Sequence, residues 1–370
     1  MVSQSMFNVL LPRALPLCHC KRRDRWTIFP GRRLRNPLND PMISLKHTFP
    51  FDPSYGYTLE NLLAVGVPEA PKDYESFWTA RYTEALEVNP QPVMTQTGQA
   101  KQGWRVHDLT YESTGAAKIG GWCLVPLTGI VERAVVVLHG YGGREQPDFH
   151  WPFENTAILF PCARGTGRSP HPPVSANPMW HVLHDIQNPD LYIHGGCVED
   201  VWLAVSAALR LFPQVEGRVG LLGASFGGGI GVMALAWDRR IAGAHFNVPS
   251  FGNQPLRLTL KTTGSGAAVQ AAHRRNPSVV ERTLSYYDAA VAARWIKVPV
   301  HCACALFDPM VAPPGQFAIY NALPTGKELF VLGAGHFEHP GQGREEQELL
   351  QEVHRYFLGL WEISPLGNGV

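Results

Sequence analysis

The feature that most constrains this chain is an apolar run that leads straight into a glycine-rich turn around Ser225. Residues 220–229 read GLLGASFGGG and continue into the apolar stretch 230–236. The pattern G-x-S-x-G between two apolar runs predicts a buried strand, a sharp turn that carries the serine, and a helix. Glycines flank the turn because side chains there would collide with neighbouring backbone. The serine hydroxyl then stands clear beside a helix N-terminus, whose free N–H groups favour a developing oxyanion.

An acidic residue and then a histidine follow Ser225 along the chain. The motif alone is only moderately specific, because glycine-rich turns also make simple crossovers between strands and helices. A serine nucleophile of this kind expects its acid after a later strand and its histidine later still. Asp308 follows the apolar run 298–306, in a loop that three prolines stiffen. A carboxylate there can hold an imidazole in one tautomer; the alternative is that Asp308 caps a helix beginning near Pro314.

The candidate histidine is His336, which follows the apolar run 329–332 in a glycine-rich loop. From there it can take the proton of Ser225 as general base and pass it to the leaving group as general acid. The chain contains 15 histidines, and it is the position after the acid that singles out His336. His339, three residues later, is the alternative base.

A second glycine-rich turn, residues 139–143, follows the apolar run 134–138 and reads HGYGG. Glycines let the backbone bend its N–H groups toward a reacting carbonyl. We expect the N–H of Tyr141 and that of Phe226 to form the oxyanion hole. The alternative is that 139–143 is only a tight turn.

Continuous apolar runs predict the fold. Such runs indicate strands covered on both faces, as in a parallel sheet, and their alternation with helical patterns predicts a doubly wound α/β fold with helices on both faces. Residues 73–82 and the pair 104–113 and 118–126 predict an N-terminal helix and hairpin extension. Two insertions, 170–195 and 249–282, follow strands and should form the pocket walls that set selectivity. The expected strands are 134–138, 157–160, 219–222, 241–246, 298–306 and 329–332, and the expected helices are 198–212 and 345–358.

Composition limits the partners and the compartment. With 370 residues and a formal net charge of +1, nothing marks the chain as a nucleic-acid binder. Residues 1–41 hold eight basic and two acidic residues. We expect a disordered leader there, upstream of a start at Met42, with an organellar transit peptide as the alternative. Residues 42–365 should form one domain, without a membrane span. Seven cysteines without paired C-x-x-C motifs favour a reducing compartment and predict no metal site.

Several segments together resemble the acetyl xylan esterase and cephalosporin-C deacetylase family of carbohydrate esterases. The similarity spans roughly residues 45–358. It implies an α/β-hydrolase, without metal or organic cofactor, that removes acetyl groups from small substrates, namely short xylo-oligosaccharides and cephalosporins. It also implies a cytoplasmic homo-oligomer, often a hexamer, with Ser225, Asp308 and His336 as catalytic triad and Tyr141 in the oxyanion loop. The segments that carry the resemblance are 163–167, 223–229, 248–249, 282–288, 308–314 and 317–321.

Three departures from the family pattern concern selectivity. Phe226 stands where the family usually has glutamine, which removes a polar side chain from the expected pocket mouth. Phe337 separates His336 from Glu338, which are commonly adjacent in the family, and the segment after Arg168 is rewritten. These departures favour a shift toward other small acyl esters, so a general small-acyl carboxylesterase is an alternative.

Other classes are disfavoured by specific residues. Dienelactone-hydrolase-like enzymes usually carry a cysteine nucleophile, and peptidases on the same sheet commonly have a propeller domain ahead of it. Ser225 and the short N-terminal region argue against both. A non-catalytic binding protein would be expected if a member of the triad were missing, and none is.

Overall fold

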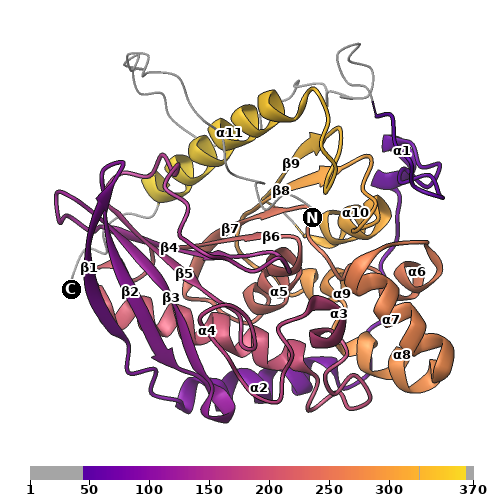
Figure 1. The fold of residues 1–370 in the computed structure, drawn as a ribbon, viewed down its shortest axis with the longest axis horizontal. Coiled ribbons are helices and arrows are strands. Elements are labelled where there is room, and N and C mark those ends of the chain that lie inside the picture. The colour runs from indigo at the N-terminus through magenta and orange to yellow at the C-terminus, as the bar shows by residue number, and fades with distance from the viewer. Residues whose placement is uncertain (1–44, 325, 364–370) are drawn as a thin grey trace.

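A nine-stranded sheet organises the chain, and six of its strands run parallel to one another (Figure 1). The computed structural model describes residues 45–324 and 326–363. The strand order is β1-β2-β3-β5-β4-β6-β7-β8-β9, with β1, β2 and β3 antiparallel to their neighbours. The strands are β1 (Val93–Lys101), β2 (Trp104–Glu112), β3 (Lys118–Pro126), β4 (Arg133–Leu138), β5 (Thr156–Pro161), β6 (Val219–Ala224), β7 (Ile241–Asn247), β8 (Val300–Ala305) and β9 (Lys327–Leu332).

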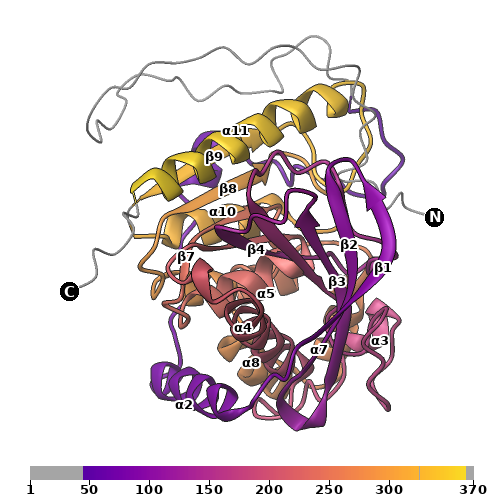
Figure 2. The same cartoon turned by 90° about the vertical axis from the view of Figure 1, so that its left-hand side faces the viewer.

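Helices cover both faces of this sheet, as the continuous apolar runs predicted. In Figure 2, α11 lies along one face, and α4 and α5 lie on the other. Alternate residues of a strand point to opposite faces: Val136 packs in the cluster shared with α4 and α5, and Val137 in the cluster shared with α11. The helices are α1 (Leu59–Leu63), α2 (Tyr74–Glu87), α3 (Pro178–His181), α4 (Ile193–Leu211), α5 (Phe226–Leu235), α6 (Gln254–Thr259), α7 (Gly264–Arg275), α8 (Pro277–Tyr286), α9 (Ala289–Ala293), α10 (Pro313–Ala322) and α11 (Gln342–Ile363).

The N-terminal extension is a helix and a hairpin, with one strand more than expected. Tyr74 and Trp78 of α2 are buried, so its aromatic residues belong to the core. Strands β2 and β3 form the predicted hairpin. The sequence did not predict β1, because this edge strand is largely exposed and its residues do not alternate between apolar and polar.

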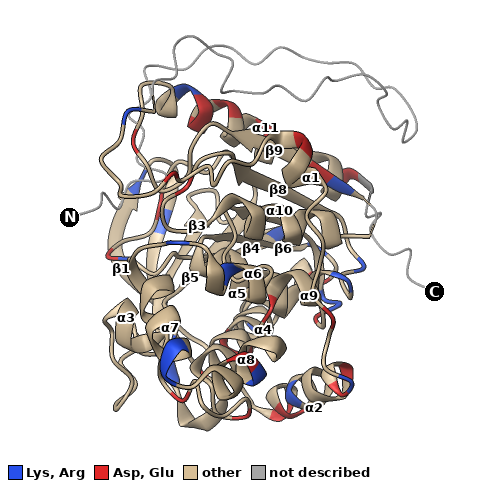
Figure 3. Cartoon of the chain, turned by 90° about the vertical axis from the view of Figure 1, so that its right-hand side faces the viewer, with Lys and Arg blue, Asp and Glu red and all other residues tan. Residues whose placement is uncertain are grey.

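Two expectations concern the chain as a whole, and the described residues test only part of them. The expected leader, residues 1–41, lies outside them. Within 45–324 and 326–363, no helix combines the length and apolar character needed to cross a bilayer. Figure 3 shows acidic and basic residues near one another on α2 and α11, consistent with the small formal net charge of the whole sequence.

Candidate active site

Ser225 occupies the tight turn between β6 and α5. Its backbone has φ 53° and ψ −115°, a conformation that costs a residue with a side chain of order 1–3 kcal/mol and is typical of functional turns. The flanking glycines are required by contact. A Cβ at Gly227 would lie 2.6 Å from the carbonyl oxygen of His139, and one at Gly223 would overlap the backbone of Gly227. The turn therefore has the geometry that the G-x-S-x-G pattern predicted.

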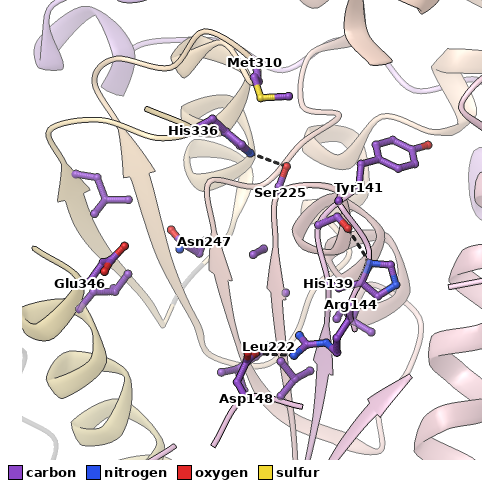
Figure 4. Close-up of a pocket in the computed structure, with 18 of the residues that line it drawn as sticks. His139, Tyr141, Arg144, Asp148, Leu222, Ser225, Asn247, Met310, His336 and Glu346 are labelled. Carbon is purple, nitrogen blue, oxygen red and sulfur yellow. Dashed lines mark hydrogen bonds and ion pairs between the residues drawn. The ribbon is translucent and has the colours of Figure 1, made fainter. Parts of the chain in front are cut away.

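The three residues expected to act together are hydrogen-bonded in series. His336 Nε2 lies 2.9 Å from Ser225 Oγ, and His336 Nδ1 lies 2.7 Å from Asp308 Oδ2. Figure 4 shows the imidazole directed at the serine hydroxyl. They come from the turn after β6, the loop after β8 and the loop after β9, whose carboxyl ends share one edge of the sheet because these strands are parallel.

Asp308 is fixed by four donors, and this fixes the tautomer of His336. Its carboxylate is fully buried. Oδ1 accepts from the N–H groups of Met310 and Val311, both at 2.9 Å, and Oδ2 accepts from Gln316 Nε2 at 3.0 Å. A carboxylate accepts, so His336 carries its proton on Nδ1 and presents an unprotonated Nε2 to Ser225. The capping alternative for Asp308 is wrong, because α10 begins at Pro313 with Ala312 as its N-cap.

Gln316 is a site residue that the sequence did not reveal. It is fully buried on α10, and its Oε1 accepts from the N–H of Ala305 at 2.8 Å. That bond orients the amide so that Nε2 points at Asp308. The one signal in the sequence is a glutamine in the first turn of a helix that follows the acidic loop, and this pattern is too common to be diagnostic.

Tyr141 and Phe226, the two residues expected to supply the oxyanion donors, belong to segments that a hydrogen bond joins. Gly227 N–H donates to the carbonyl of His139 at 3.1 Å, which ties the 139–143 loop to the start of α5. Among the described residues, the N–H groups of Tyr141 and Phe226 have no backbone or side-chain acceptor, and Phe226 is the first residue of α5. Both are available to an oxygen that develops negative charge next to Ser225.

His139 holds the oxyanion loop through both ring nitrogens. Burial lowers its pKa to about 4, so the ring is neutral. Its Nδ1–H donates to the carbonyl of Gly140 at 2.7 Å, and its Nε2 accepts from the N–H of Ala163 at 2.9 Å. The loop after β4 is thereby attached to the segment after β5.

The side chains of Tyr141 and Phe226 turn away from the serine and into a buried aromatic cluster. Their rings stack with centroids 4.1 Å apart, and Phe226 is 1% exposed. The expectation that residue 226 faces the pocket mouth is therefore wrong. Tyr141 Oη lies 3.2 Å from His181 Nδ1 and 2.9 Å from His194 Nε2.

The direction of these bonds follows from one carbonyl. His181 Nε2 lies 3.0 Å from the carbonyl oxygen of Arg164 and must donate to it. Burial lowers the pKa of both His181 and His194, so each ring is neutral. His181 Nδ1 then accepts from the tyrosine hydroxyl, and His194 Nε2–H donates to it. This network anchors the loop that carries the Tyr141 N–H, and no sequence motif pointed to it.

His339, the alternative base, does not reach Ser225. Its Nδ1 accepts from the N–H of Gly341 at 3.2 Å, and its Nε2 lies 3.6 Å from Glu345 Oε2. The histidine that bonds Ser225 is His336. In the described parts of the chain, no three side chains of metal-binding type are grouped so that they could hold an ion.

A cavity of about 370 Å³ opens beside Ser225 and His336. It lies on the sheet face that α11 covers, and its lining includes Leu222 of β6 and Gln342 of α11. Figure 4 shows Asn247, Glu346 and the Arg144–Asp148 pair around it. Neither insertion, 170–195 or 249–282, contributes to its lining, so the expectation that these insertions form its walls is wrong. The walls come from the loops after β4 and β9, from β6 and β7, and from α11.

Comparisons with known proteins identify the family and the fold. The family model for acetyl xylan esterase matches residues 58–353. The acetyl xylan esterase of Paenibacillus sp. R4 superimposes with a TM-score of 0.72 at 22% identity, over 80% of this chain and 99% of that one. Acetyl xylan esterase 1 of Thermoanaerobacterium sp. JW/SL YS485 gives 0.69 at 21%, over 84% and 100%. The acylaminoacyl peptidase of Pyrococcus horikoshii gives 0.53 at 15%, over 71% and 42%.

At these identities the structural likenesses establish the fold, which is that of the α/β-hydrolases. The family match establishes more, because it covers most of the chain. This chain belongs to the acetyl xylan esterase family and is a carboxylic ester hydrolase.

Proposed function

We propose that this protein is a serine esterase that removes acetyl groups from small acetylated carbohydrates through an acetyl-enzyme. The observation that carries the proposal is the hydrogen-bonded series from Ser225 Oγ through His336 to the buried carboxylate of Asp308. Nucleophile, base and a group that orients the base are the three parts that acyl transfer by serine needs.

In the first step, Ser225 Oγ attacks the ester carbonyl carbon while its proton moves to His336 Nε2. Asp308 stabilises the imidazolium that forms and keeps Nδ1–H directed at itself. The carbonyl oxygen becomes an oxyanion, and the N–H groups of Tyr141 and Phe226 donate to it. The C–O bond to the alcohol then breaks, and His336 gives its proton to the departing alkoxide.

In the second step, a water molecule takes the place of the alcohol. His336 Nε2 removes one of its protons as the water oxygen attacks the acetyl-enzyme. The second tetrahedral intermediate collapses, the proton returns to Ser225 Oγ, and acetate leaves.

The substrate class follows from the family and from the names of the two bacterial esterases with the same fold. Acetylated xylo-oligosaccharides are the first candidates. The acetoxymethyl group of cephalosporin C and longer small-acyl esters belong in the same panel, because each presents an ester to the same nucleophile.

The test compares Ser225→Ala with Ser285→Ala, a serine of α8 whose hydroxyl bonds the carbonyl of Arg282. We expect Ser225→Ala to lower kcat on p-nitrophenyl acetate by about 10⁴-fold or more and to abolish labelling by a fluorophosphonate probe. Ser285→Ala should retain both. Wild-type turnover by Ser225→Ala would refute the serine mechanism. Acetate release from the panel then ranks the substrates.

A further inference from the structure

Two polar side chains of β7 face the cavity on the α11 side of the sheet. Asn247 pairs in register with Ala224, the residue before the nucleophile, and His245 pairs with Leu222. Residues two apart on a strand share a face, and both of these line the cavity that also contains Ser225 and His336. They therefore form one polar wall of the cavity, and Figure 4 shows Asn247 in this wall.

Each of these side chains has a buried polar atom without a protein partner. Asn247 is 5% exposed, and its Oδ1 has no hydrogen bond among the described residues; His245 is 2% exposed, and the same holds for its Nε2. A buried polar atom left unpaired is destabilising. Both atoms are covered, but they belong to side chains that line the cavity, so a ligand there can pair with them when these side chains turn toward it.

The chemistry of the wall favours an uncharged hydroxyl-bearing ligand. Burial and the neighbouring His301 lower the pKa of His245, so its ring is neutral. Its Nδ1 lies 2.9 Å from His301 Nδ1, and whichever ring donates, His245 Nε2 remains a donor or an acceptor. A hydroxyl can pair with either form and can also donate to Asn247 Oδ1.

Four of the charged side chains around the cavity have partners. Arg144 pairs with Asp148 at 2.5 Å, and the carboxylate of Glu345 accepts from the N–H of Gly333 at 3.1 Å. Glu346 accepts from Gln342 Nε2 at 2.8 Å. Glu145 and Glu338 also line the cavity, so acidic side chains outnumber basic ones there and disfavour an anionic ligand.

The volume of the cavity indicates which half of the ester it can hold. A methyl group is comparable to a water molecule, whose share of liquid volume is roughly 30 Å³. The cavity, at about 370 Å³, is therefore far larger than an acetyl group requires. The half of an acetyl ester that matches this volume and the polar wall is the alcohol.

We propose that this cavity binds the hydroxyl-bearing alcohol half of the ester, and that Asn247 Oδ1 and His245 Nε2 hydrogen-bond its hydroxyl groups. The inference rests on the proposed esterase function and adds a specificity subsite to it. Asn247 and His245 are specificity residues here, separate from the three that perform the chemistry.

The test uses glycerol monoacetate and propyl acetate, which share a carbon skeleton and differ by two hydroxyl groups. Wild type should have the higher kcat/KM on glycerol monoacetate. Asn247→Leu and His245→Phe should each lower that value by about 3- to 10-fold, the range expected for one lost hydrogen bond. Their values on propyl acetate should stay within about twofold of wild type.

His301→Phe is the matched control for His245→Phe. It also breaks the imidazole pair, but His301 does not line the cavity. We expect its ratio of kcat/KM on the two esters to equal that of wild type. A similar fall of that ratio in His301→Phe would mean that the pair acts through structure, and it would overturn the assignment of His245.

Other outcomes also contradict the inference. A wild-type preference for propyl acetate would overturn it without any variant. Unchanged ratios in Asn247→Leu and His245→Phe would mean that water alone pairs with these atoms. The two variants could also change the kcat/KM ratios among p-nitrophenyl acetate, butyrate and hexanoate and leave the ratio between glycerol monoacetate and propyl acetate unchanged. That result would assign the cavity to the acyl chain. Failure of wild type on acetylated xylo-oligosaccharides would refute the proposed carbohydrate substrate, while the glycerol comparison still decides the subsite.

Discussion

Replacing the buried acid by its isosteric amide tests the proposed mechanism most sharply. In Asp308→Asn, one carboxylate oxygen becomes an NH₂ group, although four donors meet this carboxylate. An NH₂ in the place of Oδ1 would face the backbone N–H groups of Met310 and Val311. These groups are donors and cannot become acceptors. The NH₂ should therefore replace Oδ2, opposite Gln316 and His336.

The consequence falls on His336. The amide of Gln316 is held by the N–H of Ala305 and the carbonyl of Val311, so it resists rotation. The imidazole adapts instead: Nδ1 becomes the acceptor and Nε2 carries the proton. An Nε2–H cannot accept the proton of Ser225. We expect kcat on p-nitrophenyl acetate to fall by about 10⁴-fold, as in other serine triads, or roughly 5.4 kcal/mol of transition-state stabilisation.

The control is Asp238→Asn, which also removes a buried carboxylate. Asp238 pairs with Arg240 at 2.6 Å, just before β7 begins and at the opposite end of the sheet from the nucleophile. It should lose stability but keep kcat. Asp308→Asn should keep its circular dichroism spectrum and lose kcat. A kcat for Asp308→Asn within about tenfold of wild type, in a folded protein, would refute the tautomer argument.

Three more predictions rest on contacts in the structure. Tyr141→Phe removes the hydroxyl between two buried imidazoles; we expect kcat on p-nitrophenyl acetate to fall about 10-fold or more while KM changes little, because loss of the anchor displaces one oxyanion donor. Gly227→Ala places a Cβ 2.6 Å from the carbonyl oxygen of His139. We expect a lower melting temperature and a lower kcat on p-nitrophenyl acetate. Wild-type values of both would show that the 139–143 loop moves to make room for the Cβ. Burial lowers the pKa of His139 to about 4 and that of His301 to about 3, so the unfolded chain binds more protons below pH 6.5. The free energy of unfolding should therefore fall as pH decreases from 6 to 5, by about 1.4 kcal/mol per pH unit for each histidine; urea unfolding at both pH values tests this, and His301→Phe should show the smaller slope.

The parallel strands were predictable because a strand that is buried on both faces consists of consecutive apolar residues. Strands β4, β6 and β8 appear where such runs predicted them, with small differences at their ends. The edge strand β1 carries no such signal, since most of its side chains meet solvent. It pairs with β2 as a hairpin across Gln102 and Gly103, so a local turn places this strand and not an apolar run.

The first turn of α4 shows the same limit inside the core. Gly195 and Gly196 argue against a helix, and the sequence predicted one only from residue 198 onward. The helix nevertheless begins at Ile193, and the glycines in its first turn leave room for two arginines: a Cβ at Gly195 would overlap the guanidinium of Arg81, and one at Gly196 that of Arg164. Those arginines come from distant segments, so no local pattern could indicate the contact.

The candidate triad could be found from chain order because its members sit at strand ends that parallel pairing brings to one edge. The histidines bonded to Tyr141 could not, because they lie 40 and 53 residues from it. Gln316 is only eight residues from Asp308, but no motif marks a glutamine that bonds the acid. Motifs thus identify the groups that touch the ester, and tertiary packing identifies the groups that hold them in place.

The structure also changes the expected effect of Phe226 on substrate selectivity. Its ring stacks on Tyr141 and lies against His194, on the side of the oxyanion loop, and it does not line the cavity. The absence of glutamine there removes no polar group from the cavity wall. The polar atoms next to the nucleophile come from β7 instead. If the proposed subsite is correct, substrate choice in this chain depends on Asn247 and His245, and substitutions at position 226 should change kcat on all acetyl esters alike without changing the preference among alcohols.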